Sequence, residues 1–148
     1  MTRYLLDTNI ISNATKPVPS ELLTEWMTKQ ADDDLFISSF SLAEIYRGIL
    51  EKPSGKKRRE LEAWFEGSEG PQALFNGRVL AFDERAALIW GRLMSQGTME
   101  GHPRSGFDMV VAAIAEANDC TVVTDNEKHF PGVKLLNPLR SVSDPEIS

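Results

Sequence analysis

The sequence is poor in the residues that build disulfide frameworks, zinc sites and membrane spans. It contains one cysteine, Cys120, and two histidines, so an internal disulfide is excluded and a zinc site is disfavoured. No apolar run approaches the roughly 18 residues that a transmembrane helix requires, and the first residues lack the apolar core of a signal peptide. We therefore expect a cytoplasmic protein that does not associate with a membrane.

An excess of positive charge is also missing. Sixteen basic and 22 acidic side chains give a formal net charge of −6, which argues against a protein that coats nucleic acid by bulk charge. A small nucleic-acid site neutralised by metal stays compatible with this charge. The chain is 148 residues long and 41% hydrophobic, which suits one domain with a substantial core. We assign residues 1–140 to a single domain and expect 141–148 to form a flexible polar tail.

Segments with strand and helix periodicity alternate along the chain. We expect strands at 3–6, 35–38, 78–82, 120–124 and 134–136, and helices at 10–15, 20–30, 41–50, 56–66, 84–94 and 107–118, with a loop at 97–105. Such alternation predicts an α/β fold with a parallel sheet covered on both faces. In sheets of this kind, sites form beyond the carboxyl ends of the strands.

Polar residues stand where the predicted strands end and where two apolar helices begin. They are Asp7, Ser38-Ser39 and Thr124-Asp125-Asn126 after three strands, with Glu44 and Asp108 in the first turns of the helices at 41–50 and 107–118. Crowded carboxylates have raised pKa values unless a cation compensates them. Hard oxygen ligands of this kind select Mg²⁺ or Mn²⁺. The pattern therefore predicts a divalent metal site at one edge of the sheet.

Each of these residues also has an ordinary structural explanation. Asp7 could cap the helix that follows it, and Asp108 could offset a helix dipole. Glu44 could close a capping box with Ser41, and the pair at 125–126 could belong to a turn. Capping explains every position separately, but it does not require all of them at one edge of one sheet. That convergence favours the metal site.

Four motifs carry these residues: LLDTNIIS at 5–12, SLAEIYRGI at 41–49, DMVVAAIA at 108–115 and VVTDNEKHF at 122–130. In order and approximate spacing they resemble PIN-domain proteins, above all the VapC ribonuclease toxins of bacterial toxin–antitoxin pairs. The likeness extends from Leu5 to about Pro138. It implies a PIN-like three-layer α/β/α sandwich with a central parallel sheet of about five short strands.

The resemblance also implies an activity, a Mg²⁺-dependent endoribonuclease toxin, with Mn²⁺ as the alternative ion. Asp7, Glu44 and Asp108 carry over as the catalytic, metal-binding acids. Asn126 matches the fourth catalytic position of the family as a neutral ligand. The residue before it is often basic in the family, whereas here it is Asp125, which we keep as the alternative because it could supply the charge that Asn126 lacks. The groups that would orient these acids or water molecules are Thr8, Asn9, Ser39 and Thr124.

The resemblance further implies partners: a VapB-like antitoxin, an RNA substrate, a second copy of the chain, and operator DNA for the assembled complex. The candidate RNA-backbone contacts lie in the only dense basic run, Lys52, Lys56, Lys57, Arg58 and Arg59, with Arg47 near the acids as a further candidate. The ordinary explanation of this run is a solvated helix start. We interpret His129 as a loop residue rather than a general acid.

Three other functions compete with this hypothesis. A phosphatase with Asp7 as nucleophile needs a second acid two residues later, where the chain has Asn9. A receiver-type signalling domain is imitated only weakly, by Asp83 and Lys134. A non-catalytic PIN-like subunit that binds partners and regulates is compatible with the neutral Asn126, although three intact acids argue against it.

Overall fold

A parallel sheet of five strands, in the order β3-β2-β1-β4-β5, forms the centre of the molecule. The computed structural model describes residues 2–139, and the tail predicted at 141–148 lies outside them. The strands are β1 (Arg3–Leu6), β2 (Leu35–Ser38), β3 (Val79–Leu80), β4 (Cys120–Val123) and β5 (Leu135–Leu136). The central strand β1 pairs through Leu5 with Phe36 on one side and Val122 on the other. The predicted parallel α/β sheet is confirmed.

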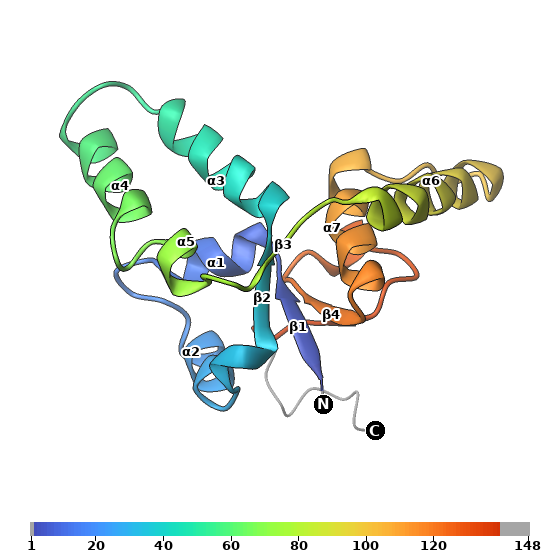
Figure 1. The fold of residues 1–148 in the computed structure, drawn as a ribbon, viewed down its shortest axis with the longest axis horizontal. Helices are drawn as coiled ribbons and strands as arrows, with labels where there is room; N and C mark the ends of the chain where they lie inside the picture. Colours follow the sequence, from blue (N-terminus) through green and yellow to red (C-terminus); the bar gives the residue numbers. More distant parts are fainter. Residues whose placement is uncertain (1, 140–148) are drawn as a thin grey trace.

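Helices cover both faces of this sheet, with α6 and α7 on one side and α1, α2 and α5 on the other (Figure 1). Their bounds are α1 (Thr8–Ala14), α2 (Glu21–Thr28), α3 (Ser39–Leu50), α4 (Lys56–Glu66), α5 (Pro71–Leu74), α6 (Glu84–Met99) and α7 (Gly106–Ala117), with 3₁₀ turns η1 (Asp32–Asp34) and η2 (Glu127–His129). Helices α3 and α4 form an arm that projects from the sheet (Figure 1). No helix among residues 2–139 combines the length and apolarity needed to span a membrane.

Two hydrophobic clusters hold the layers together, one on each face of the sheet. Neighbouring strand residues point to opposite faces, so Leu5 and Val122 pack in the cluster that contains α7, whereas Leu6 and Val123 pack in the cluster that contains Ile10 of α1. Because β1 and β4 bury side chains on both faces, their carboxyl ends are held rigidly. A side chain that follows either strand therefore has a fixed position.

Several predicted boundaries were wrong. Helix α6 continues to Met99 through part of the predicted loop, because its last turns are polar and lack the apolar periodicity on which the prediction rested. Gly97 is buried there, and a Cβ atom at this position would lie 2.9 Å from the carbonyl oxygen of His102. The glycine thus makes room for the returning chain instead of ending the helix. Strand β3 is two residues long rather than five, and the short helix α5 was not predicted.

Candidate active site

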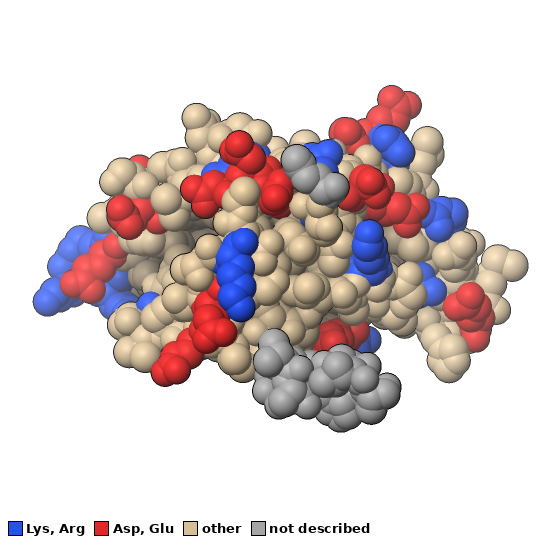
Figure 2. All heavy atoms as spheres, turned by 90° about the horizontal axis from the view of Figure 1, so that it is seen from below, with Lys and Arg blue, Asp and Glu red and all other residues tan. Residues whose placement is uncertain are grey.

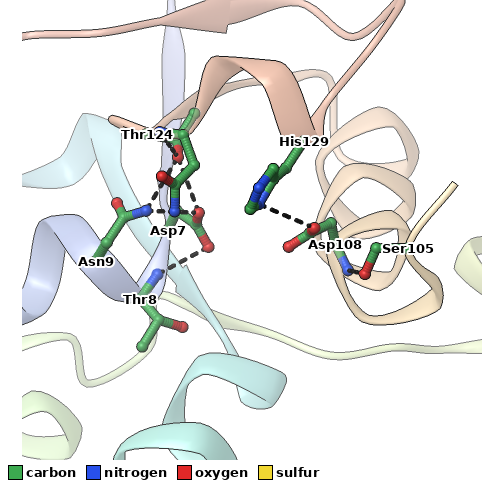
Figure 3. Close-up of polar contacts among 8 residues, drawn as sticks. Asp7, Thr8, Asn9, Ser105, Asp108, Thr124 and His129 are labelled. Atoms are coloured by element: carbon green, nitrogen blue, oxygen red, sulfur yellow. Dashed lines mark hydrogen bonds and ion pairs between the residues drawn. The ribbon is translucent and has the colours of Figure 1, made fainter.

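Asp7 directly follows the central strand β1, and its carboxylate is the most buried acid of the carboxyl edge, with 8% of the residue exposed. Its Oδ1 atom accepts the backbone N–H of Thr8 at 2.9 Å, which makes Asp7 the N-cap of α1. Its Oδ2 atom accepts the hydroxyl of Thr124 at 2.9 Å and the amide of Asn9 at 3.4 Å (Figure 3). The capping explanation is therefore correct for Asp7 Oδ1. It does not account for the hydrogen bonds that Oδ2 accepts from Thr124 and Asn9.

The electrostatics of Asp7 are those of an acid that lacks a counter-charge. Its pKa is raised from 3.8 to about 6, with burial as the largest cause. Hydrogen bonds from Thr124 and Thr8 lower this pKa, while the negative charges of Glu44 and Asp108 raise it. Three carboxylates from β1, α3 and α7 therefore interact electrostatically at one edge of the sheet. A nearby cation would lower the pKa of Asp7 by favouring its ionised form.

Glu44 reaches this edge from helix α3. The hydroxyl of Thr8 donates to Glu44 Oε1 at 2.5 Å and lies 2.9 Å from the hydroxyl oxygen of Ser41. The capping box suggested for Ser41 and Glu44 does not form, because α3 begins at Ser39 and Ser38 is its N-cap, accepting the N–H of Ser41 at 2.9 Å. The side chain of Glu44 is thereby left available to the site.

Asp108 lies in the first turn of α7, whose N-cap is Ser105. Its carboxylate faces the same space as that of Asp7 (Figure 3). His129 of η2 lies against it, with Nδ1 3.4 Å from Asp108 Oδ2. This contact was not predicted, because nothing in the spacing of VVTDNEKHF indicates that η2 folds back over α7. His129 therefore lies in a 3₁₀ turn rather than in the predicted loop, and this turn adjoins the acids.

Among the residues that follow β4, Thr124 contacts the site through its side chain, and Asp125 and Asn126 donate only backbone N–H groups. Thr124 is fully buried, and its hydroxyl oxygen accepts the Asn126 N–H at 3.0 Å and the Asn9 amide at 3.3 Å. The Asp125 N–H approaches Asn9 Oδ1 at 3.5 Å. The side chains of Asp125 and Asn126 are exposed and form no hydrogen bond or ion pair within residues 2–139. Their assignment as catalytic residues stays a prediction.

The serines around the start of α3 have a different arrangement from the predicted one. Ser39 is exposed and takes no part in the hydrogen-bond network of the described residues, whereas Ser38 and Ser41 are fully buried beside Thr8. The role of Ser39 in orienting acids or water molecules stays a prediction, and Ser41, which was not predicted, is the serine of α3 that contacts Thr8. Thr8, Asn9 and Thr124, which the resemblance assigned to the surroundings of the acids, do contact them.

Lys56 to Arg59 of the basic run form the first turn of α4, and Lys52 lies in the connection between α3 and α4, at the tip of the arm. Lys and Arg side chains gather at the left end of the molecule in Figure 2, where the arm projects in Figure 1. Three of the basic residues form i,i+4 ion pairs: Arg47 with Glu51 at 2.8 Å, Lys56 with Glu60 at 3.9 Å and Arg58 with Glu62 at 3.4 Å. Lys52, Lys57 and Arg59 are exposed and have no acidic partner in the described part of the chain.

The donor chemistry of the acidic edge fits a hard divalent cation. Carboxylate oxygens of Asp7, Glu44 and Asp108 face one region, with threonine hydroxyls beside them. Within residues 2–139, however, no group of three or more His, Cys, Asp or Glu side chains is arranged to hold an ion by itself. Mg²⁺ commonly takes one or two carboxylates directly and keeps several water molecules, so a partly hydrated ion suits this geometry.

Comparison with known proteins gives consistent matches along nearly the whole chain. A family model described as a PIN domain matches residues 4–134. The toxin FitB of Neisseria gonorrhoeae is 34% identical over 136 residues, covering 90% of this chain and 96% of that protein. The VapC ribonuclease Y4jK of Sinorhizobium fredii is 32% identical over the same coverage. The solved structure of FitAB bound to an IR36 DNA fragment has a TM-score of 0.84 and 32% identity, covering 93% of this chain and 96% of that chain.

Proposed function

The chain belongs to the PIN-domain family, and from this premise we propose that it is an endoribonuclease toxin that hydrolyses RNA phosphodiesters with a divalent metal ion. The relatives named as a toxin and as a VapC ribonuclease support this activity. The observation that carries the proposal is the convergence of Asp7, Glu44 and Asp108 at the carboxyl edge of the sheet. These acids reach that edge from three separate elements, which helix capping does not require.

The residues of the site have distinct tasks in this reaction. Asp7 and Asp108 would hold Mg²⁺, or Mn²⁺ as the alternative, and Asn126 or Asp125 would complete the site on the β4 side. Once bound, the ion supplies positive charge to the phosphodiester and lowers the pKa of an attacking water. Glu44, which Thr8 positions through a hydrogen bond, is placed to orient that water. Thr124 and Asn9 fix the rotamer of Asp7.

Substrate binding requires positive charge that the chain as a whole lacks, since its formal net charge is −6. The arm supplies it: Lys52, Lys57 and Arg59 carry charges that no acidic side chain among the described residues neutralises. We propose that they contact the RNA backbone, together with Lys56, Arg58 and Arg47 when their i,i+4 ion pairs open. The pairs of Arg47 and Lys56 are exposed to solvent, and that of Arg58 is partly buried; surface ion pairs are weak, so opening the exposed ones costs little.

The partners follow from the same family relationship. The chain pairs with an antitoxin of the VapB kind, and the pair binds operator DNA, in keeping with the DNA-bound FitAB complex. We also propose that the chain forms a homodimer and acts in the cytoplasm, where its single cysteine stays reduced. The competing phosphatase function lacks its second acid: the amide of Asn9 donates to Asp7 and Thr124 at that place.

Cleavage of labelled RNA tests the proposal directly. We expect cleavage by the wild-type protein in Mg²⁺, and none in EDTA or with Asp7→Asn. Asp33→Asn is a matched control, because Asp33 is an exposed acid that precedes β2 at the opposite edge of the sheet. Undiminished cleavage in EDTA would contradict the metal mechanism, and failure to cleave transfer, ribosomal and messenger RNA in either Mg²⁺ or Mn²⁺ would contradict the ribonuclease function.

Ion binding can be measured without the reaction. We expect Mg²⁺ to raise the melting temperature of the wild-type protein and of Asp33→Asn, and to leave Asp7→Asn and Asp108→Asn unchanged. Equal shifts in all four proteins would show that the ion binds elsewhere.

A further inference from the structure

An exposed phenylalanine lies immediately beside the acidic edge. Phe107 precedes Asp108 in the first turn of α7, and 64% of the residue is exposed. Its ring contacts that of Phe40 in α3, with centroids 5.5 Å apart and an interplanar angle of 43°. Phe40 is partly buried and packs against the hydrophobic cluster on the α7 side of the sheet. One ring is thus anchored in the core, and it supports a second ring that stands largely in solvent.

The position of this pair distinguishes it from an ordinary exposed apolar side chain, of which soluble proteins have many. Phe107 and Asp108 are adjacent in the first turn of α7, so their Cα atoms are about 3.8 Å apart although their side chains point in different directions. Phe40 lies four residues before Glu44 on the same helix. The two helices that deliver these acids to the site therefore also deliver the two rings.

The rings complement the charges around them. A polyanionic substrate at this edge meets three carboxylates, and an uncharged aromatic face adds attraction there without adding to the repulsion. Proteins that bind single-stranded RNA commonly stack unpaired bases on exposed aromatic side chains. One exposed ring is enough to stack a single nucleobase, whereas a docked protein partner buries ~800 Å² on each side over many residues.

We propose that Phe107, braced by Phe40, is a stacking platform for a nucleobase adjacent to the phosphodiester that is cleaved. The substrate is then RNA with an unpaired base at that position, as in a loop or a single-stranded junction. This inference rests on the proposed ribonuclease function and adds a specificity-determining residue to it. Stacking tolerates any base, so it selects for an unpaired conformation more than for a sequence.

The test combines a protein change with a change in the RNA. The cleavage site is first mapped with the active protein, and fluorescein-labelled oligonucleotides are then made across it, with either the intact sequence or an abasic nucleotide at each flanking position in turn. Binding is measured by anisotropy in Mg²⁺ in an Asp7→Asn background, so that the RNA stays whole. We expect Phe107→Ala to weaken binding of the intact RNA by roughly 5- to 100-fold.

The same variant should change binding of one abasic RNA less than twofold, because the stacked base is already missing there. Phe107→Trp should restore tight binding of the intact RNA. Met99→Ala is the control, since Met99 is 84% exposed at the far end of α6 and should leave binding unchanged.

Two results would overturn the platform alone: intact RNA bound equally well by Phe107→Ala, or an equal loss with the intact and every abasic RNA. In either case a wild-type protein that still cleaves RNA leaves the proposed function in place. A wild-type protein that neither cleaves nor binds RNA would overturn the function, and the platform with it.

Discussion

At the level of single residues, Asp7 has two tasks that make opposite demands on its charge. As the N-cap of α1 it needs only an oxygen that accepts the Thr8 N–H, which a neutral amide also provides. As a metal ligand it must be ionised, although burial and two neighbouring acids hold its pKa at about 6. Without a cation, ionised Asp7 therefore destabilises the fold that positions it, as polar groups at functional sites often do.

This conflict predicts how Asp7→Asn changes stability. The folded-state pKa of about 6 exceeds the ordinary value of 3.8, so the stabilising contribution of Asp7 is full below about pH 4 and lost as pH rises through about 6. Asparagine does not titrate. In EDTA, Asp7→Asn should therefore gain unfolding free energy relative to wild type between pH 4 and pH 7.5, by at most about 3 kcal/mol.

Urea unfolding of both proteins at the two pH values measures this difference. Asp33→Asn should show no comparable change, because Asp33 is exposed. A constant difference between Asp7→Asn and wild type at both pH values would mean that Asp7 is ionised in the fold without cost.

At the level of helices and strands, the sequence was informative where a residue follows a buried strand. Asp7 and Thr124 directly follow β1 and β4, whose buried side chains identify them as strands, so their meeting at one edge could be predicted from topology alone. The sequence was less informative about which side of a helix a residue faces, because that depends on the residue at which the helix begins. The start of α3 was predicted two residues too late, so Ser41 was interpreted as a helix cap although it lies inside the helix and contacts Thr8; adjacent helix residues point about 100° apart, so such an error changes the inferred direction of every side chain.

The contact between His129 and Asp108 depends on tertiary structure. It requires η2 to fold back over the start of α7, and this path is set by Phe130, which is almost completely buried in the core next to His129. Local patterns reveal that Phe130 is apolar, but not which cluster it joins. Contacts made by irregular segments therefore had to be learned from the structure.

The exposed basic residues of the arm formed by α3 and α4 should affect the binding of RNA more than the chemical step. Neutralising its free charges with Lys57→Gln and Arg59→Gln should raise KM for RNA on the order of tenfold while kcat stays within about twofold, since these residues lie away from the acids. The salt dependence of binding should fall by about 0.7 in slope for each lost phosphate contact.

Lys134→Gln is the matched control for the arm, because Lys134 is an exposed lysine that precedes β5 at the opposite edge of the sheet. Steady-state kinetics at several salt concentrations distinguish the two explanations of the basic run. Unchanged KM and salt slope in the double variant would identify it as a solvated helix start.

At the level of the whole molecule, the acidic charge limits how the protein can approach RNA. The formal net charge is −6, and three of the negative charges lie together at the site, where Asp7 interacts with both Glu44 and Asp108. A polyanion therefore meets repulsion where it must be bound most closely, unless a cation intervenes. Removing the acids should therefore raise the affinity for RNA in the absence of a cation, but abolish cleavage of RNA.

Neutralising two of these acids makes that opposition measurable. Asp7→Asn combined with Asp108→Asn changes the formal net charge from −6 to −4 and should abolish cleavage in Mg²⁺. In EDTA at pH 7.5 the same protein should bind RNA more tightly than wild type, by about tenfold, because each unit charge about 6 Å from a phosphate costs ~0.7 kcal/mol even in water.

Asp32→Asn combined with Asp33→Asn makes the same change in net charge at the opposite edge of the sheet and should alter RNA binding less than twofold. If the active-site variant binds RNA no better than wild type in EDTA, the acids do not face the RNA backbone, and the site lies elsewhere on the molecule.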